Sequence, residues 1–373
     1  MEHSDVIVVG AGVIGASVAY GLQAQGLKVK MLDERSATLR ASLGNFGLVW
    51  IQGKGQGAPH YTEWVLRSAK LFPQFTEQLQ QETGINIDYR KPGGLVLSHG
   101  QAEYDKRSAI LQRLRNESRD GSYDAEMLDR NAVQKLVGQL KLGPGIVGGS
   151  FCPHDGHLNP FALLKSLHKS FQLQGGQFSP DAPVISITPG KSGFVVTTPH
   201  ERFGADKVVI AAGLASKRLG SMLGIHAPVR PERGQLLVTE RTKEKLTIPI
   251  MGIQQTAEGS FVVGLSNEKT GVNTDTDTEV IKSMSKRIRN AFPALGHLRV
   301  VRSWGALRVL PEDGLPIYHQ SESCPGAYVV TSHSGVTFAP MQTGEVARWI
   351  RTDEEPEIIA PFSARRFNVK ATG

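Results

Sequence analysis

The hydrophobic pattern at the start of the chain changes from a strand period to a helix period. Four apolar residues, Val6–Val9, are followed at once by the glycine-rich Gly10–Gly15, and apolar positions then recur with helical spacing. The pattern predicts a buried strand, a tight turn, a helix over about Ala16–Gln25, and a second strand, Lys28–Leu32, that ends in Asp33. This order is that of a βαβ unit of the dinucleotide-binding type.

Each part of this unit has its own chemical reason. Gly10 permits the tight turn, Gly12 lets a pyrophosphate approach the backbone, and Gly15 lets helix and strand touch. The helix N-terminus supplies amide groups for the pyrophosphate, and Asp33 can accept hydrogen bonds from a ribose 2′-hydroxyl. The alternative is a glycine-rich turn without a ligand. Because strand, helix and acid are all in register, the sequence favours nucleotide binding.

The rest of the chain alternates between helical and strand patterns. A helix over Leu66–Gln81 ends at Gly84, and a Lys-Pro-Gly-Gly turn between Ile85–Tyr89 and Gly94–Leu97 predicts a hairpin. Further expected elements are a helix from Asn159-Pro160 to near Gly175, strands at Val184–Ile187, Phe194–Thr197, Lys207–Ile210 and Tyr328–Thr331, a helix opened by the capping box Thr276-Asp277-Thr278-Glu279, and a helix near Thr343–Ile350. Nucleotide-type segments lie at the beginning, middle and end, which predicts a discontinuous nucleotide lobe (residues 1–85, 145–225 and 300–373) and a second lobe (residues 86–144 and 226–299).

Composition and charge exclude several classes of function. The chain has 373 residues, 40% hydrophobic and 21% charged, which allows a large core in two lobes. The net charge of +7 raises the question of nucleic acid, but the clusters at Lys106–Arg119 and Lys282–Arg289 lie on amphipathic helices as solvated faces, so no nucleic-acid partner is expected. No run of about 18 apolar residues is present, and a strand that begins at Asp5 leaves no room for a signal peptide. Cys152 and Cys324 are too few for a disulfide framework, so the sequence predicts a cytoplasmic protein without a membrane span.

The stretch Gly44–Gly57, GNFGLVWIQGKGQG, is rich in glycine around one lysine. A P-loop requires four residues between its first glycine and the Gly-Lys pair, followed by Ser or Thr. Here five residues separate Gly47 from Gly53, and Gly55 follows Lys54, so the stretch is not a P-loop. For Lys54 itself, a flexible surface lysine is favoured over a site lysine.

Seven segments, in order, resemble the D-amino-acid oxidase-like flavoproteins, which include glycine oxidase, sarcosine oxidase and the β-subunits of proline, hydroxyproline and opine dehydrogenase complexes. The segments are Val6–Gly15 with Asp33; Arg40-Ala41-Ser42 through Gly47; Asp155–Pro160; Ala205–Gly213; Arg233-Gly234-Gln235; Trp304–Ile317; and Ser332–Pro340. The resemblance implies noncovalently bound FAD. It implies an α/β and α+β fold, in which an FAD-binding Rossmann-like domain of the glutathione-reductase type carries an inserted antiparallel-sheet substrate domain. It also implies that the glycines of Gly44–Gly57 let the backbone lie against the flavin ring.

The same resemblance assigns residues to the cofactor. The positions it implies for FAD contact are Gly10, Gly12, Val13, Ile14, Gly15, Asp33, Glu34, Ala41, Ser42, Phe46, Gly47, Leu48, Val184, Ala212, Gly213, Ser334, Gly335, Val336 and Thr337. No metal site is expected. His154 and His157 flank Asp155, but this motif fits a structural loop of the flavin lobe that leads into a helix.

The substrate site implied by the resemblance centres on Arg308, which matches the family arginine that grips the substrate carboxylate. A planar guanidinium suits this role because two parallel charge-assisted hydrogen bonds fix orientation as well as position. This chain departs from the family at Val309, where proline is usual, and it has no tyrosine in Arg241–Gly264, where relatives that oxidise small amino acids commonly carry one. The other candidate catalytic residues are His60, Tyr61, Gln254 or Gln255 as substitutes for that tyrosine, and His333, which either contacts the ring or is an ordinary loop histidine.

The expected reaction is oxidation of a carbon–nitrogen bond next to a carboxylate, with hydride passing to flavin N5 and the imine hydrolysing to a 2-oxo acid. The expected substrate is an amino acid or a secondary-amine acid such as an opine or hydroxyproline. Val262 stands where the sarcosine oxidase branch has a lysine that promotes reaction with oxygen. The resemblance therefore favours the β-subunit of a multisubunit dehydrogenase with companion FAD or FMN and iron–sulfur subunits. Two alternatives stay open: a stand-alone glycine or D-amino-acid oxidase, and a catalytically inactive flavin-binding structural subunit.

Overall fold

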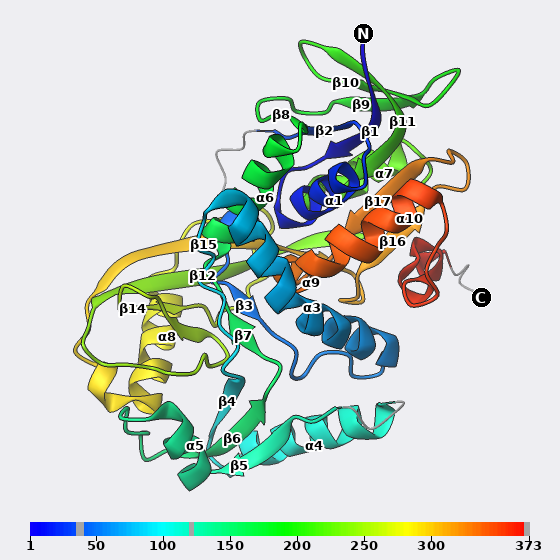
Figure 1. Ribbon diagram of the computed structural model, residues 1–373. Helices are drawn as coiled ribbons and strands as arrows, with labels where there is room; N and C mark the ends of the chain where they lie inside the picture. Colours follow the sequence, from blue (N-terminus) through cyan, green and yellow to red (C-terminus); the bar gives the residue numbers. More distant parts are fainter. Residues whose placement is uncertain (35–40, 119–122, 369–373) are drawn as a thin grey trace.

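The first sheet lies near the N-terminus, at the top of Figure 1. The computed structural model describes residues 1–34, 41–118 and 123–368; Arg40 and Arg119, which belong to a flavin motif and a basic cluster in the sequence, lie outside these ranges. In the described residues, this sheet has eight strands in the order β16-β17-β11-β1-β2-β8, with β10 beside β11 and β9 beside β10. The strands are β1 (Glu2–Val9), β2 (Val29–Leu32), β8 (Gln177–Ser179), β9 (Ser186–Pro189), β10 (Phe194–Thr197), β11 (Arg202–Ile210), β16 (Ile317–Gln320) and β17 (Ala327–Thr331).

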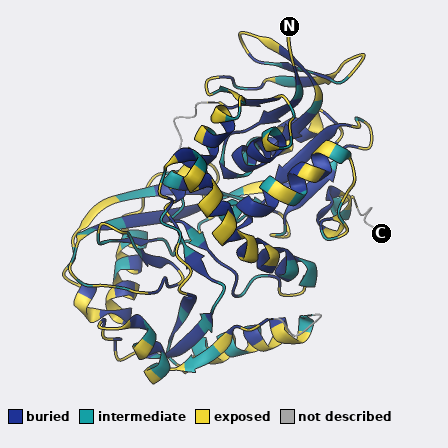
Figure 2. Ribbon diagram, viewed as in Figure 1, coloured by how far each residue is buried: buried dark blue, intermediate teal, exposed yellow. Residues whose placement is uncertain are grey.

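β1 is central to this sheet because its apolar run is buried on both faces. Val6–Val9 are each no more than 4% exposed, and β1 pairs in parallel with β2 on one side and with β11 on the other. Parallel strands with both faces covered have continuous apolar runs. The predicted strands at Val6–Val9 and Lys207–Ile210 are therefore confirmed, and Figure 2 shows this sheet as mainly buried.

Helices cover this sheet and fix the turn after β1. α1 (Val13–Ala24) packs against α6 (Pro160–Leu173) and the C-terminal helices, and a Cβ at Gly21 would lie only 2.1 Å from the Thr343 carbonyl oxygen. The other helical segments of the described chain are α2 (Ala41–Gly44), α3 (Pro59–Thr83), α4 (Gln101–Glu117), α5 (Arg130–Val137), α7 (Ser216–Ser221), α8 (Thr278–Ala291), α9 (Gly335–Met341), α10 (Ala347–Thr352), the π-helical turn η3 (Gln342–Val346), and the 3-10 turns η1 (Gly213–Ala215), η2 (Pro293–Leu295), η4 (Ala360–Phe362) and η5 (Ala364–Phe367). Within the described residues, none of them combines the length and the apolar composition that a bilayer span requires.

A second, antiparallel sheet lies on the left of Figure 1, below the first sheet. Its long strands β12 (Val229–Arg241) and β15 (Val300–Pro311) pair along nearly their whole length, in the order β13-β14-β12-β15. A bridge between Leu95 and Ile250 joins it to the three-stranded β4-β6-β5. The remaining strands are β3 (Leu48–Val49), β4 (Gly94–His99), β5 (Glu126–Asp129), β6 (Ile146–Cys152), β7 (Gly156–His157), β13 (Ile253–Gln255) and β14 (Ser260–Val263).

Two local predictions are wrong. Residues Ile85–Tyr89 do not form a strand, and β4 pairs with β6, so the Lys-Pro-Gly-Gly turn closes no hairpin. α8 is capped by Asp277, whose Oδ1 accepts a hydrogen bond from the Glu279 N–H at 2.8 Å, and so Thr276 does not open a capping box. Aspartate is as good an N-cap as threonine or better, and here it stands one residue closer to the helix.

Three other helix ends test the local signals. The Asn159 side chain accepts hydrogen bonds from two amides of the first turn of α6, as expected for an N-cap. α3 ends at Gly84, which is left-handed with a φ of 69°, as predicted. The C-terminal helix starts at Gly335, eight residues before the expected Thr343–Ile350 segment; Pro340 lies inside α9, and the π-helical turn η3 follows α9 directly.

The strand pairing moves two strands away from the predicted nucleotide lobe. β6 pairs with β4 and β5 in the three-stranded sheet, and β15 pairs with β12 in the second sheet, although β6 and β15 lie within residues 145–225 and 300–373. Pairing partners are set by tertiary contacts that sequence order does not reveal. As a division into two folding units, the proposed boundaries stay a prediction.

Candidate flavin and substrate site

The turn after β1 is a close-packed glycine cradle. Gly10 has a φ of +106°, and a Cβ there would lie 2.3 Å from the Ala211 carbonyl oxygen. A Cβ at Gly15 would lie 1.9 Å from the Gly10 carbonyl oxygen, so α1 touches the turn directly. Ala212 and Gly213 follow β11, the parallel neighbour of β1, and therefore lie at the same edge of the sheet. This is the close helix–strand packing that the glycine fingerprint predicts.

The N-terminus of α1 faces this cradle without a side-chain cap of its own. Gly12 is the N-cap residue, and a Cβ there would lie 2.8 Å from Ser42 Oγ. The Val13 N–H donates to the same Ser42 Oγ at 3.0 Å. Asp33 is 8% exposed at the end of β2, and its Oδ2 accepts a hydrogen bond from the Ala11 N–H at 2.6 Å. The acid expected to hold a ribose therefore also fixes the glycine turn.

A second helix N-terminus meets the first. α9 begins at Gly335, where a Cβ would lie 2.9 Å from Ile14 Cγ1, and Ser334 before it is left-handed with a φ of 65°. The Ser332 hydroxyl, at the end of β17, is buried and has no hydrogen-bond partner among the described residues. Helix N-termini stabilise negative groups. The meeting of α1 and α9 thus provides a place for an anionic ligand.

The remaining positions expected to contact the cofactor have mixed surroundings. Glu34 is exposed, Val184 is buried, and Thr337 is buried with its Oγ1 accepting a hydrogen bond from the Trp50 N–H at 3.3 Å. Ala41, Phe46, Leu48 and Val336 lie in α2, in the loop after α2, in β3 and in the first turn of α9. Direct cofactor contact by these residues stays a prediction.

The glycine-rich stretch Gly44–Gly57 packs against protein. A Cβ at Gly44 would lie 2.0 Å from the Ala306 side chain on β15, which ties this stretch to the second sheet. Gly47 has a φ of +79°, and a Cβ there would lie 2.1 Å from the Leu158 carbonyl oxygen. These glycines thus have a packing reason of their own. That they also admit the flavin ring stays a prediction.

Arg308 lies on β15 with its guanidinium over the backbone of β12. A Cβ at Gly234 would lie 2.5 Å from Arg308 Nη2 and 2.6 Å from Cζ, so a side chain there would displace the guanidinium. Nη1 donates to Asn267 Oδ1 at 2.7 Å and lies 3.8 Å from Glu232 Oε1. Burial lowers the pKa of Arg308, while the charges of Glu232 and Glu268 oppose that shift. The side chain therefore remains a cation.

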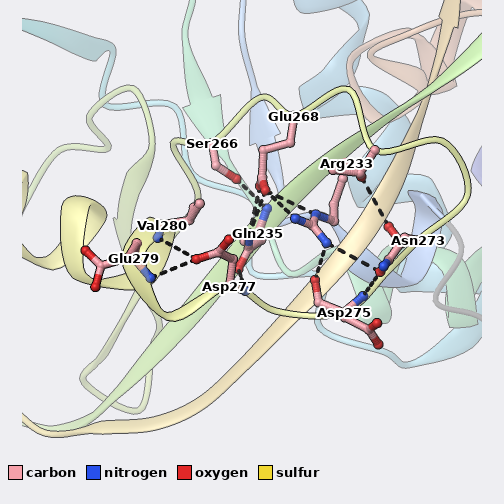
Figure 3. Close-up of polar contacts among 10 residues, drawn as sticks. Arg233, Gln235, Ser266, Glu268, Asn273, Asp275, Asp277, Glu279 and Val280 are labelled. Carbon is pink, nitrogen blue, oxygen red and sulfur yellow. Dashed lines mark hydrogen bonds and ion pairs between the residues drawn. The ribbon is translucent and has the colours of Figure 1, made fainter.

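The two neighbours of Gly234, Arg233 and Gln235, bind Glu268, as Figure 3 shows. Glu268 follows Asn267 in the chain. Arg233 Nη2 and Nε donate to Glu268 Oε2 at 2.5 and 3.2 Å, and Gln235 Nε2 donates to both Glu268 oxygens at 2.9 Å. The side chains of Arg233 and Glu268 are only 7% and 16% exposed. Charge-assisted hydrogen bonds in such surroundings fix geometry. In the motif Arg233-Gly234-Gln235, the glycine admits the guanidinium and its neighbours position the loop beside it.

The ionisable side chains of His333, Lys54 and Arg308 interact by charge near the N-terminus of α9. Burial, together with the charges of Lys54 and Arg308, lowers the pKa of His333 to about 3. Burial also lowers the pKa of Lys54 to about 7, against the opposing charge of Asp155. Lys54 Nζ lies 5.8 Å from the centre of the Phe338 ring on α9. The position of the amine beside the buried Phe338 ring disagrees with a freely flexible surface lysine, and a role of Lys54 in the site stays a prediction.

Two other candidate catalytic residues have partners within the protein. Tyr61 is 6% exposed, and its ring centre lies 5.7 Å from that of Phe338. Gln254 Nε2 donates a hydrogen bond to the Phe46 carbonyl oxygen. His60 is partly exposed in the first turn of α3. Tyr61 thus packs in the core and Gln254 positions the loop after α2, and contact of any of the three with substrate stays a prediction.

Asp155 anchors the glycine-rich stretch. It is completely buried; its Oδ1 accepts from the Ile51 N–H at 2.6 Å and the Gln52 N–H at 3.2 Å, and its Oδ2 accepts from Gln52 Nε2 at 2.6 Å. Burial raises the pKa of Asp155 to about 7, although these hydrogen bonds oppose the shift. His154 pairs with Asp124 at 3.0 Å. Within the described ranges, no group of three His, Cys, Asp or Glu side chains could hold a metal ion.

Sequence reasoning missed the partners of Arg308. Asn267 and Glu268 lie in a polar loop without a motif, and their contact with β12 and β15 depends on the pairing register. Glu232 lies two residues before Gly234 on β12 and so shares its face, directly opposite Arg308 in the pairing with β15.

The residues present fit a dinucleotide cofactor. The cradle around Gly10 and Gly15 excludes a side chain, the first turn of α1 contains no acidic residue, and Asp33 stands at the end of the second strand. These features supply backbone donors for a pyrophosphate and a carboxylate for a ribose.

Comparison with known proteins agrees with this geometry. The family model described as FAD dependent oxidoreductase (DAO) matches residues 5–349. An opine oxidase subunit of Agrobacterium tumefaciens (strain Ach5) is 36% identical over 370 residues, which cover 99% of each chain. Glycine oxidase of Geobacillus kaustophilus (strain HTA426) is 25% identical over 379 residues, 98% of each chain. The crystal structure of glycine oxidase from Geobacillus kaustophilus superposes with a TM-score of 0.87 at 22% identity, covering 98% of this chain and 99% of that one.

These likenesses confirm the expected fold, with its FAD-binding lobe and antiparallel second sheet. The glycine cradle is consistent with the noncovalent nucleotide binding that was expected. A family match over nearly the whole chain is independent of any single motif. The chain belongs to the DAO family of FAD-dependent oxidoreductases, and its cofactor is FAD.

Proposed function

We propose that this enzyme oxidises the carbon–nitrogen bond of an amino acid or secondary-amine acid, giving an imine that water hydrolyses to a 2-oxo acid and an amine. Bound FAD supplies the two-electron acceptor for the hydride that leaves the carbon next to nitrogen. The task of the protein is to hold this carbon in place and to keep the nitrogen lone pair available.

The observation that carries this proposal is the placement of Arg308. Its Nη1 is engaged by Asn267, and among the described residues Nη2 and Nε make no hydrogen bond. The Nη2–Nε edge of the guanidinium therefore keeps two donors for a carboxylate, which is the bidentate arrangement that fixes an acid in one orientation. Asn267 and the Gly234 backbone hold the guanidinium itself in one position.

Charge around this space supports an anionic substrate. Arg308 is a cation, Lys54 is near its titration point at neutral pH, and His333 is neutral because burial and both neighbouring charges lower its pKa to about 3. A neutral histidine adds no competing charge. An acid whose carboxylate binds Arg308 would therefore meet a neutral His333 and a Lys54 that is only partly charged at neutral pH.

The likeness to the opine oxidase subunit supports two finer parts of the proposal. The first is that the substrate is a secondary-amine acid of the opine type. The second is that this chain works as one subunit of a complex, with companion subunits that carry electrons away. The likeness to glycine oxidase favours the alternative of a self-sufficient oxidase.

Anaerobic reduction of the bound flavin tests the proposal. The purified yellow protein is mixed with octopine, nopaline, D-hydroxyproline, sarcosine and glycine, and the loss of flavin absorbance is followed. We expect bleaching with at least one of them, most readily with an opine, and slow reoxidation in air. Fast reoxidation would favour the stand-alone oxidase. No bleaching by any acid would contradict the proposal in favour of an inactive structural subunit.

Variants of one strand test the role of Arg308. Arg308→Lys keeps the charge but loses the bidentate fork, and Arg308→Met loses both; we expect the substrate concentration for half-maximal reduction to rise by roughly tenfold and by 100-fold or more, respectively. Arg302→Met is the matched control, because Arg302 lies on the same strand β15, away from the partners of Arg308. Equal affinity in Arg308→Met and the wild type would refute the carboxylate assignment.

A further inference from the structure

The backbone around Lys54 is clamped so that its side chain points inward. The Lys54 N–H donates to the Ile51 carbonyl oxygen at 3.2 Å, and the Lys54 carbonyl oxygen accepts from Thr62 Oγ1 at 3.2 Å. The next residue, Gly55, is wedged against α3, since a Cβ there would lie 2.0 Å from the same Thr62 oxygen. Lys54 is therefore held by both neighbouring segments, and its Nζ lies near the Phe338 ring.

The titratable groups around Lys54 come from three elements. Asp155, after β6, acts on Lys54 with an opposite charge, and His333, before α9, lies close enough for the Lys54 charge to alter its pKa. Arg308 on β15 acts on the same histidine. The Asp155 carboxylate is in turn linked through Gln52 to Arg107, whose Nη2 donates to Gln52 Oε1 at 2.7 Å. Lys54 is thus an amine close enough to Asp155 and His333 to interact with both by charge, and His333 is likewise within reach of the Arg308 charge.

We propose that Lys54 is the base that accepts a proton from the ammonium group of the bound substrate before oxidation. This inference rests on the proposed function, because it assigns a role in that reaction. His333 interacts by charge with both Arg308 and Lys54, so an acid held by Arg308 with its nitrogen turned toward His333 would bring that nitrogen toward the Lys54 amine, which becomes charged when it gains a proton. His333, with a far lower proton affinity, is a poorer acceptor.

The step balances without a redox partner. One N–H bond of the substrate ammonium breaks, its electron pair stays on the substrate nitrogen, and the Lys54 amine forms a new N–H bond. Asp155, in its ionised form, stabilises the resulting ammonium of Lys54 by charge. The pKa of Lys54, lowered by burial to about 7, leaves much of the amine neutral at neutral pH, as a base requires. The substrate then enters oxidation with its lone pair available.

Two measurements on the FAD-loaded enzyme test this proposal. In the first, flavin reduction by the best substrate of the panel is measured from pH 5.5 to 9 in wild type, Lys54→Gln and Lys54→Arg. In wild type we expect the rate to rise with pH around an apparent pKa near 7; both variants should lose this limb and be slower by roughly 100-fold. Lys282→Gln, which removes an exposed lysine of α8, is the matched control and should behave as wild type.

The second measurement does not depend on turnover. The melting temperature of wild type minus that of Lys54→Gln is followed with pH. The folded-state pKa of Lys54 lies below its unfolded value, so the unfolded chain binds more protons between about pH 7 and 10, and this difference should rise across that window. A flat difference together with an unchanged pH limb would overturn the proposal. Wild-type flavin that no amine acid reduces would instead contradict the proposed function, and the inference with it.

Discussion

A single methyl group at Gly15 should separate cofactor binding from folding. A Cβ there would lie 1.9 Å from the Gly10 carbonyl oxygen, whereas real Cβ contacts are essentially never under 3.0 Å. In Gly15→Ala, α1 and the turn must therefore separate by about 1 Å, the difference between these two distances. Both contacting groups are backbone, so no flexible side chain can move aside. Overpacking of this kind costs about 1–3 kcal/mol of folding free energy.

The cost to FAD binding should exceed what this folding loss alone would cause. Backbone amides at the start of α1 that move by about 1 Å lose hydrogen bonds to a pyrophosphate, and each bond to a charged group contributes about 1.5–3 kcal/mol. Loss of one such bond weakens binding by roughly 10- to 100-fold. The assay titrates the apoprotein with FAD and follows flavin fluorescence, and a melting curve of the same sample gives the folding loss.

Gly145→Ala is the matched control for this change. Gly145 has open space where a Cβ would be added, so we expect full flavin content and a change in stability within about 0.5 kcal/mol. If Gly15→Ala binds FAD within about threefold of wild type, the contact between α1 and the glycine turn does not support the pyrophosphate site. The cofactor would then have to bind elsewhere on the fold.

Two further substitutions test the networks around the site. Glu268→Ala should cost about 3–5 kcal/mol in the free energy of unfolding, measured by denaturant titration, because it leaves the Arg233 charge buried without its partner. Lys282→Ala, which breaks an exposed ion pair, is the control and should cost no more than about 0.5 kcal/mol in the same titration. Asp155→Asn should destabilise the protein by about 1–3 kcal/mol, since the new side-chain amide would face the Gln52 amide that now donates to Asp155. Unchanged stability in Glu268→Ala or in Asp155→Asn would show that the hydrogen-bond network of that residue adds nothing to folding.

Local signals predicted the nucleotide half of the molecule well. The strand Val6–Val9, the glycine turn and Asp33 lie next to each other in the chain, so their geometry follows from short-range rules. The N-cap at Asn159 and the left-handed Gly84 were correct for the same reason. The hairpin at Ile85–Tyr89 failed because its turn residues say nothing about which distant strand β4 will meet.

Pairing register is also what concealed much of the substrate site. Gly234 appears in the sequence only as part of a short motif, and its reason emerges once β12 and β15 are aligned and the Arg308 guanidinium is found over it. Asn267 becomes relevant because Glu268, its neighbour, is held by Arg233. Contacts between residues tens of positions apart leave no periodicity to read.

The electrostatic environment of Lys54 also depends on long-range contacts that the sequence does not reveal. A lysine between glycines suggests a flexible exposed loop, since glycine-rich stretches are usually mobile. In this fold the glycines have the opposite effect: Gly55 lets the backbone press against Thr62, and the clamp turns the amine toward Asp155 and the interior. The resulting desolvation changes a permanent surface cation into a group that titrates near neutrality. The same residue type can thus be a solubilising charge or a base, and the packing of its neighbours decides between the two.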